Sequence, residues 1–388
     1  MISPLWSLIW AAPFIPALSA SRRKPDLNDY PPAADGKLSV IIPARNEAGN
    51  IATVLDAVTA SAYPDLEIVV VDDRSTDATA DIVRRVAAKD PRVRLIPGQE
   101  LPAGWYGKPW ACLQGARASS GRYLLFTDAD TRHHPTLIGR AVSAMMTEKP
   151  GLLTVAPRQL CLTFWERVVM PQVWLLLGIR YHPARVNHAT KSRDIIANGQ
   201  FILMQRESYQ AIGTHEAVKG EVAEDLALAQ TAHRKGQRVW FAFAENLMET
   251  RMYDGLRPMI EGWSKNLYLG GRRSFPDQPL LQALVPLSLS IAMLFWLIPP
   301  VALAVALVAA PWLLNAALVA TGICIVFWSG VVRAMQIPLI YALAYPAGSV
   351  MALYILLRST WRGGKRIEWR GRTYEESGAG TPTSLGSD

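Results

Sequence analysis

The sequence contains few cysteines and lacks two common nucleotide-binding motifs. Among its 388 residues are three cysteines, Cys112, Cys161 and Cys324, whose spacing matches no zinc or redox motif. We therefore interpret them as reduced thiols in core or membrane positions. A G-x-G-x-x-G fingerprint and a Walker motif are also absent, which disfavours a dinucleotide-binding fold and a P-loop fold.

Charge is missing from a long C-terminal tract. In residues 278–357, Arg333 is the only charged residue. Because one helical membrane span needs about 20 apolar residues, this tract predicts two or three transmembrane helices. Their expected positions are about 281–308, 311–332 and 336–357. A buried helix of a water-soluble domain does not explain so long an uncharged tract.

Basic residues flank the apolar segments at both ends of the chain. Residues 1–20 are apolar and precede Arg22-Arg23-Lys24, which predicts an uncleaved membrane anchor or, because of its prolines, an interfacial helix. Residues 358–388 begin with a basic juxtamembrane segment, which the positive-inside rule places in the cytosol beside anionic lipids. A span next to this segment disfavours nucleic acid as its partner. The tail after Tyr374, rich in Gly, Ser and Thr, is expected to be disordered.

These membrane predictions conflict with one another. Three full spans after a cytosolic domain would leave the basic tail outside the cell. Either one segment is re-entrant, with Pro299-Pro300 as its expected break, or the charge rule fails. The sequence leaves both alternatives open.

Residues 37–250 show an alternation of strands and helices. Apolar strands are predicted at 37–43, 66–71, 92–96 and 122–127, with helices at 48–60, 78–88 and 109–119. This alternation predicts an α/β fold with a mostly parallel sheet and helices on both faces. Ligands of such sheets bind at the carboxyl ends of the strands.

Polar clusters follow three of these strands. They are Pro43-Ala44-Arg45-Asn46-Glu47, Asp72-Asp73 and Asp128-Ala129-Asp130. Since the ends of parallel strands share one edge, we expect the clusters to form one site. Side chains two residues apart on a strand point the same way, so Asp128 and Asp130 are expected to hold one hard cation, Mg²⁺ or Mn²⁺.

The motifs occur in the order that family 2 glycosyltransferases with a GT-A fold show, and the sequence resembles that family over about residues 37–270. The resemblance rests on four stretches, Pro43–Glu47, Val71–Asp77, Thr127–Asp130 and Glu224-Asp225-Leu226. It implies that a nucleotide sugar is the donor and that the divalent cation is bound through the acidic pair and the donor phosphates.

The resemblance assigns roles to individual residues. Arg45, Glu47 and Asp73 are expected to contact the nucleotide. A helix N-cap is the alternative for the stretch Asp72–Asp77, and both can hold, with Asp77 as the cap and Asp73 as the ligand contact. Lys108 and Asp128 are expected on the donor side, with a plain surface lysine as the alternative for Lys108.

A second acidic pair is assigned to catalysis by the same resemblance. Asp225 is expected to be the general base that deprotonates the acceptor hydroxyl, with Glu224 supporting it. The alternative for both is acidic charge in the first turn of a helix. His133-His134 is interpreted as loop-lining or structural and not as a metal site.

Residues 251–277 give evidence about the kind of acceptor. Processive family members carry a Q-x-x-R-W motif that the stretch Gly262–Tyr268 lacks, which favours single transfer to a lipid over polysaccharide synthesis. Trp263, Lys265 and Arg272 are expected on the acceptor or diphosphate side, or else on an amphipathic helix at the membrane surface.

Three other stretches narrow the resemblance. Leu101–Ala111 and Thr163–Arg167 are similar to bacterial hopene-associated glycosyltransferases, and Trp369–Tyr374 is similar to ceramide and carotenoid glycosyltransferases. They point to a membrane lipid acceptor and do not choose the lipid. With the family resemblance and the apolar tract, we expect an inverting hexosyltransferase of the bacterial inner membrane, multi-pass, with its catalytic domain facing the cytosol. The expected reaction moves a hexose from a UDP-sugar to a lipid hydroxyl. The alternatives are a processive polysaccharide synthase and a non-catalytic membrane scaffold with a degenerate transferase domain.

Overall fold

The computed structural model describes residues 4–15, 24–181, 183–275, 278–363, 366–369, 372–376 and 382–385. The chain divides into two compact units. One comprises Lys24–Leu160, Pro183–Met252 and Gly364–Asp388, and the other comprises Met1–Arg23, Cys161–His182 and Tyr253–Gly363. The predicted catalytic domain at 37–250 is therefore interrupted, because residues 161–182 belong to the unit that holds the apolar helices.

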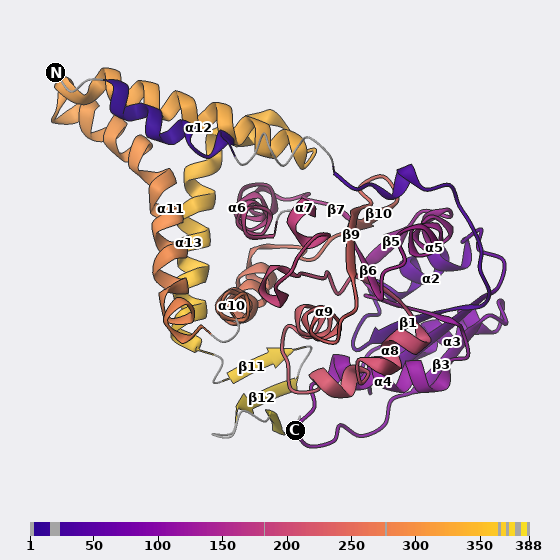
Figure 1. Ribbon diagram of the computed structural model, residues 1–388. Helices are drawn as coiled ribbons and strands as arrows, with labels where there is room; N and C mark the ends of the chain where they lie inside the picture. Colours follow the sequence, from indigo (N-terminus) through magenta and orange to yellow (C-terminus); the bar gives the residue numbers. More distant parts are fainter. Residues whose placement is uncertain are drawn as a thin grey trace. The chain divides into compact units, whose positions relative to one another are not determined.

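The first unit is built on a seven-stranded sheet of order β3-β2-β1-β4-β8-β6-β9 (Figure 1). The strands are β1 (Leu38–Ala44), β2 (Leu66–Asp72), β3 (Val93–Pro97), β4 (Tyr123–Thr127), β6 (Leu152–Ala156), β8 (Phe201–Gln205) and β9 (Val239–Phe243). β1 to β4 pair in parallel, and β8 is antiparallel to both of its neighbours. The predicted α/β fold with a mostly parallel sheet is confirmed.

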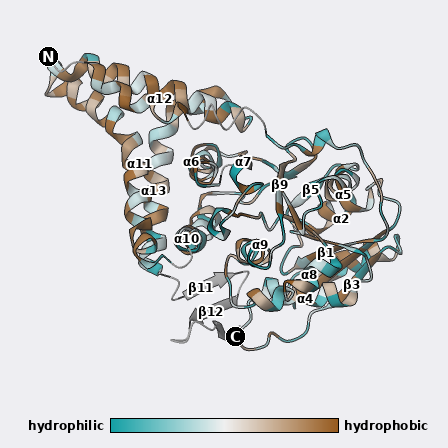
Figure 2. Cartoon of the chain, viewed as in Figure 1, coloured by the Kyte–Doolittle hydropathy of each residue, from teal (hydrophilic) through white to brown (hydrophobic). Residues whose placement is uncertain are grey.

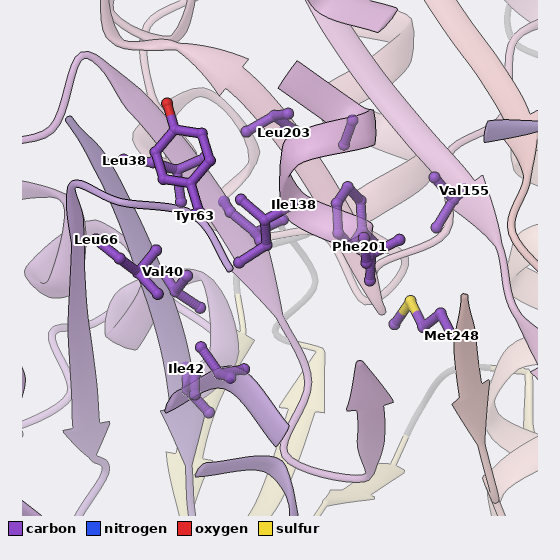
Figure 3. Close-up of a cluster of buried hydrophobic side chains, with 14 of the residues drawn as sticks. Leu38, Val40, Ile42, Tyr63, Leu66, Ile138, Val155, Phe201, Leu203 and Met248 are labelled. Carbon is purple, nitrogen blue, oxygen red and sulfur yellow. The ribbon is translucent and has the colours of Figure 1, made fainter. Parts of the chain in front are cut away.

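Helices cover both faces of this sheet because its strands are apolar on both sides. Val40 and Ile42 of β1 join a core with α2 (Ile51–Thr59), α3 (Thr79–Ala87) and α5 (Leu137–Glu148), whose centre Figure 3 shows. Ile41, between them, joins the opposite core with α4 (Gly107–Ala118), α8 (Arg206–Ala211) and α9 (Glu224–Arg234). Each such side chain is fully buried and contributes about 1.5–3 kcal/mol to stability.

Short elements complete this unit. A second sheet contains β5 (Thr131–His133), β10 (Met248–Thr250) and β7 (Arg158–Gln159), and a third contains β11 (Arg366–Trp369), β12 (Arg372–Glu376) and β13 (Pro382–Leu385). The remaining helical turns are η2 (Leu27–Asp29), α7 (Pro183–Val186), η3 (Ser192–Asp194) and η4 (His215–Val218). After Tyr374, the last two residues of β12 and all of β13 are strand residues that pair antiparallel, in contrast to the expected disorder. The expectation for residues 377–381 and 386–388 lies outside the described residues.

The second unit is helical and largely apolar (Figure 2). Its elements are η1 (Pro4–Ala11), α6 (Phe164–Arg180), α10 (Leu256–Arg273), α11 (Pro279–Val308), η5 (Pro311–Leu313), α12 (Leu314–Ala334), η6 (Leu339–Ala344) and α13 (Tyr345–Arg362). Three segments of the described residues are long and apolar enough to cross a membrane: Pro279–Val308, Pro311–Ala334 and Leu339–Arg362. They match the predicted spans closely.

The predicted break at Pro299-Pro300 does not interrupt α11, which runs through both prolines. Proline has no backbone N–H, so Pro299 cannot donate to the carbonyl of Phe295 four residues earlier. That carbonyl instead accepts a hydrogen bond from Trp10 Nε1 at 2.9 Å. The N-terminal segment thus supplies a donor that the helix itself lacks.

Helix α6 packs closely on α13, which explains its place in the helical unit. A Cβ atom at Gly348 would clash with the backbone carbonyl of Val168. Beside this contact, Gln172 Nε2 donates to the carbonyl of Tyr345 at 3.3 Å. Nothing in the sequence indicates this contact, because α6 has a charged first turn and only 17 residues.

The end of α13 lies beside α10, the helix that precedes α11. Arg358 and Arg362 both pair with Glu261 of α10, and Tyr268 N donates to Ser359 Oγ at 3.0 Å. The start of α11 also contacts α10, since Nη2 of Arg272 on α10 donates to Oε1 of Gln282 on α11 at 3.2 Å. The apolar tract therefore begins and ends at the same end of its unit.

Candidate active site

The predicted polar clusters meet at one edge of the seven-stranded sheet. Ala44, at the end of β1, pairs with Asp72 at the end of β2. Thr127, at the end of β4, pairs with Phe201 at the start of the antiparallel strand β8. This edge therefore collects three strand ends and the loop that enters β8.

The turns after β1 and β2 are bound to each other. Arg45 donates from one guanidinium nitrogen to the carbonyls of Asp73 and Arg74, at 2.6 and 3.0 Å. Asn46 N donates to Ser75 Oγ at 3.0 Å, and Asn46 and Arg74 both have positive φ, 54° and 57°. Asn tolerates this conformation better than most residues. The predicted nucleotide motifs thus form one hydrogen-bonded double turn.

The three predicted nucleotide residues lie below the surface of this double turn. Arg45 is 5% exposed, Asp73 1% and Glu47 9%. Glu47 N donates to Thr79 Oγ1, and the Glu47 carboxylate accepts from Asn50. The Arg45 side chain thus binds the backbone of the turn, and direct contact with a nucleotide stays a prediction for all three residues.

Two smaller features fix the same turn. Asp77 accepts the backbone N–H of Thr79, the first residue of α3, at 3.0 Å, and that of Ala48 at 3.0 Å. Gly98, directly after β3, donates to the carbonyl of Asp72, and a Cβ there would lie 2.6 Å from that oxygen. Sequence reasoning missed Gly98, whose only signal is a glycine directly after a strand.

The acidic pair lies in a turn and not on a strand. β4 ends at Thr127, so the alternation of side chains along a strand does not explain why Asp128 and Asp130 belong together. The turn is held from within, since Thr131 Oγ1 donates to the carbonyl of Asp128 at 2.8 Å. The Asp128 side chain is 28% exposed and accessible to a ligand.

Lys108 connects the acidic pair to the second acidic motif. It lies in the first turn of α4, and its Nζ is 2.8 Å from both Asp128 Oδ1 and Glu224 Oε1. Burial disfavours its charge, but the carboxylates around it outweigh burial and hold the pKa of Lys108 well above its usual value. With two carboxylate partners, Lys108 is not a plain surface lysine.

Glu224 and Asp225 begin α9 and differ in their proton affinity. Burial, followed by the neighbouring charge of Glu224, raises the pKa of Asp225 to about 6. Burial acts on Glu224 too, but the charge and hydrogen bond of Lys108 outweigh it, so the pKa of Glu224 lies below its usual value. Two adjacent carboxylates whose pKa values are pushed apart are typical of acid–base sites.

The loop before β8 holds Asp225 in place, and sequence reasoning missed it. Gly199 N donates to Asp225 Oδ2 at 2.9 Å, while Leu226 N donates to Oδ1 at 2.7 Å. A Cβ at Gly199 would lie 2.9 Å from Lys108 Nζ. The loop is tied to β4 because Thr127 Oγ1 donates to the carbonyl of Gln200 at 2.8 Å. The dipeptide Asn198-Gly199 is a turn signal, but nothing in it indicates a partner 26 residues away.

His133 is buried and contacts the two threonines that flank the acidic turn. Its Nε2 lies 3.1 Å from the hydroxyl oxygens of Thr127 and Thr131, and burial lowers the pKa of His133 to about 4. Its contacts are those of a structural residue. Throughout the part of the chain that the structure describes, no group of three His, Cys, Asp or Glu side chains is arranged to hold a metal ion.

The three residues predicted for the acceptor or diphosphate side lie on α10, in the helical unit. Trp263 is buried there, with Nε1 3.5 Å from Met170 Sδ. The guanidinium of Arg272 lies over the ring of Tyr268. Their roles, and that of Lys265 on the same helix, stay predictions.

Comparisons with known proteins concern the family and the fold. Residues 39–213 match the model of glycosyl transferase family 2. A 4,4'-diaponeurosporenoate glycosyltransferase of Staphylococcus aureus (strain MRSA252) is 29% identical over 248 residues, which is 62% of this chain and 63% of that protein. The enzyme of the same name from Staphylococcus haemolyticus (strain JCSC1435) is 28% identical over 63% of this chain and 64% of its own.

A solved structure has the same fold. It is a mannosyltransferase from Pyrobaculum calidifontis in complex with GDP-Man and Mn²⁺, with a TM-score of 0.55 and 20% identity over 91% of this chain and 98% of that one. The predicted resemblance and the predicted fold are confirmed. Residues 39–213 match a family 2 glycosyltransferase domain, the fold is of GT-A type, and the chain spans less than two thirds of the length of the two staphylococcal relatives.

Proposed function

We propose that the protein transfers a hexose from a nucleotide sugar, with UDP-sugar favoured, to the hydroxyl of a membrane lipid, with inversion at the anomeric carbon. The observation that carries this proposal is the placement of Asp225. Both of its carboxylate oxygens accept a backbone N–H, and the pKa of its carboxyl is raised to about 6. It is therefore oriented, and largely deprotonated at neutral pH.

Asp225 acts as the general base. It accepts the proton of the acceptor hydroxyl while the hydroxyl oxygen attacks the anomeric carbon and the bond from that carbon to the diphosphate breaks. Attack opposite to the leaving group gives inversion. Glu224, paired with Lys108 at 2.8 Å, stays ionised and keeps the proton affinity of Asp225 high through like-charge repulsion.

A divalent cation suits the donor set of Asp128 and Asp130, which supply the hard oxygen ligands that Mg²⁺ and Mn²⁺ prefer. The site already accommodates one positive charge, since the ammonium of Lys108 lies 2.8 Å from Asp128 Oδ1. Two carboxylates leave most coordination positions to water and to the donor diphosphate. When bound, the cation would neutralise charge on the leaving diphosphate.

A lipid acceptor is supported by three observations. The curated relatives are named for glycosylation of diaponeurosporenoate, three helices are long and apolar enough to cross a membrane, and the processive motif is absent from Gly262–Tyr268. Because the apolar tract begins and ends at the same end of its unit, we place the basic tail and the catalytic domain on one side, in the cytosol of a bacterium, at its inner membrane. This placement follows the charge rule and requires that one of the three apolar segments does not cross the membrane fully.

Substitution of Asp225 by Asn tests the base assignment. Asp225→Asn keeps the shape of the side chain but cannot accept the proton, so transfer should fall by at least about a hundredfold, while UDP-sugar binding measured by calorimetry is retained. Asp65→Asn, at an exposed position of the same unit, is the matched control and should keep full activity. Near-normal turnover by Asp225→Asn would exclude this base.

A further inference from the structure

We propose that the ammonium of Lys108 occupies the cation position beside Asp128 while no donor is bound. The binding of a metal ion at Asp128 then depends on the donor diphosphate. The inference rests on the proposed function and deepens it. It assigns to Lys108 a regulatory role that goes beyond contact with the donor phosphates. The ligand classes concerned are a divalent cation and a nucleoside diphosphate.

The geometry places one ammonium among three carboxylates. Lys108 Nζ lies 2.8 Å from Asp128 Oδ1 and 2.8 Å from Glu224 Oε1. Asp225 also contributes to the stabilisation of its charge. Lys108 is 22% exposed and Glu224 11%, so water screens these charges less than it would at an open surface.

A metal ion at Asp128 has to compete with this ammonium. Two cations at one carboxylate repel each other, and Lys108 has to release Asp128 Oδ1 or share it. In the absence of a nucleotide, the ion gains only the carboxylates of the acidic turn, while Lys108 loses a short ion pair. Metal binding alone is therefore weak.

A diphosphate removes this conflict. Its negative charge offers the ammonium of Lys108 a new partner and offers the metal additional oxygen ligands. The metal and the diphosphate thus strengthen each other's binding, and by thermodynamic linkage the factor is the same in both directions.

The surroundings of Lys108 allow the movement that this requires. Nζ is the end of a flexible four-carbon side chain, and its neighbour on one side is Gly199, where a Cβ would lie 2.9 Å from it. The absence of a side chain at Gly199 leaves the ammonium space to change partners. Glu224 keeps a contact with Lys108 while Asp128 is released.

Titration of the purified protein with Mn²⁺, with free Mn²⁺ counted by electron paramagnetic resonance, tests the inference. For the wild type, saturating UDP should strengthen Mn²⁺ binding by at least about tenfold. Lys108→Met should bind Mn²⁺ alone at least about tenfold more tightly than the wild type, and the gain from UDP should shrink to less than about threefold. Lys89→Met, which removes the same charge at an exposed position of α3's C-terminal flank, should behave as the wild type.

A second variant gives a prediction of opposite sign. Glu224→Gln removes one carboxylate partner of Lys108, so the ion pair between Lys108 and Asp128 becomes stronger. Mn²⁺ alone should therefore bind to this variant more weakly than to the wild type. This keeps the inference testable if Lys108→Met does not fold. Unchanged or weaker Mn²⁺ binding by folded Lys108→Met, or stronger binding by Glu224→Gln, overturns the inference. A wild type that binds UDP neither with nor without Mn²⁺ overturns the proposed function instead.

Discussion

Substitution of Gly199 by alanine should damage catalysis more than folding. The added Cβ would lie 2.9 Å from Lys108 Nζ, 3.2 Å from Asp225 Oδ2 and 3.3 Å from Asp225 Cβ. The lysine end can move at little cost. Asp225 Cβ is fixed to α9, so the loop or the carboxylate has to shift by a few tenths of an ångström.

The expected magnitudes follow from these contacts. Displacement of a positioned base of this kind should reduce kcat/KM by about 10- to 100-fold, equal to about 1.4–2.7 kcal/mol of transition-state stabilisation. The free energy of unfolding should fall by only about 1 kcal/mol, because overpacking is partly offset by the lower chain entropy of alanine in the unfolded state. Initial rates with a radiolabelled UDP-sugar and urea denaturation measure the two quantities.

The matched control is Gly49→Ala, in the same unit, where an added Cβ meets nothing within 4 Å. It should leave both kcat/KM and stability close to the wild type. If Gly199→Ala retains wild-type kcat/KM, then the contact of this loop with Asp225 does not position the base, and our reasoning about the site is refuted.

Two further predictions concern pH and the nucleotide turn. Because Asp225 accepts a proton and its pKa is raised to about 6, kcat/KM should fall about tenfold per unit as pH decreases below 6. A rate profile that is flat from pH 5 to 8 contradicts the base assignment. The same raised pKa means that the contribution of Asp225 to the free energy of unfolding declines as pH rises from about 4 to 6. Gly98→Ala places a Cβ 2.6 Å from the carbonyl oxygen of Asp72 and 3.0 Å from Asp73 Cα. Because neither backbone atom can move at low cost, the free energy of unfolding should fall by about 1–3 kcal/mol. An unchanged denaturation midpoint would disprove this contact.

Much of the fold could be predicted because its signals are local. The apolar runs of β1, β2 and β4 end at Pro, Asp or Thr-Asp, and their short length together with these bounding residues locates them. The rule that ligands bind at the carboxyl ends of parallel strands then brings the polar clusters to one edge. The uncharged C-terminal tract is equally local in its signal, and its three helices lie close to their predicted positions.

The contacts that complete the site are not local and could not be predicted. Lys108 and Glu224 are 116 positions apart in the chain, and their contact depends on how α4 and α9 lie against the same face of the sheet. The loop around Gly199 reaches the edge only because β8 runs antiparallel to β4, a direction that the alternation of strands and helices does not reveal. The place of α6 in the helical unit depends in the same way on Gly348, far along the chain.

Product analysis tests the central claim most directly. Purified protein in lipid vesicles is incubated with bacterial lipid extract, Mn²⁺ and a panel of nucleotide sugars, and the lipids are analysed by mass spectrometry. Our account predicts a lipid whose mass increases by a single hexose, formed by the wild type and absent with Asp225→Asn. A growing polymer, or no sugar-bearing lipid with any donor, would contradict it.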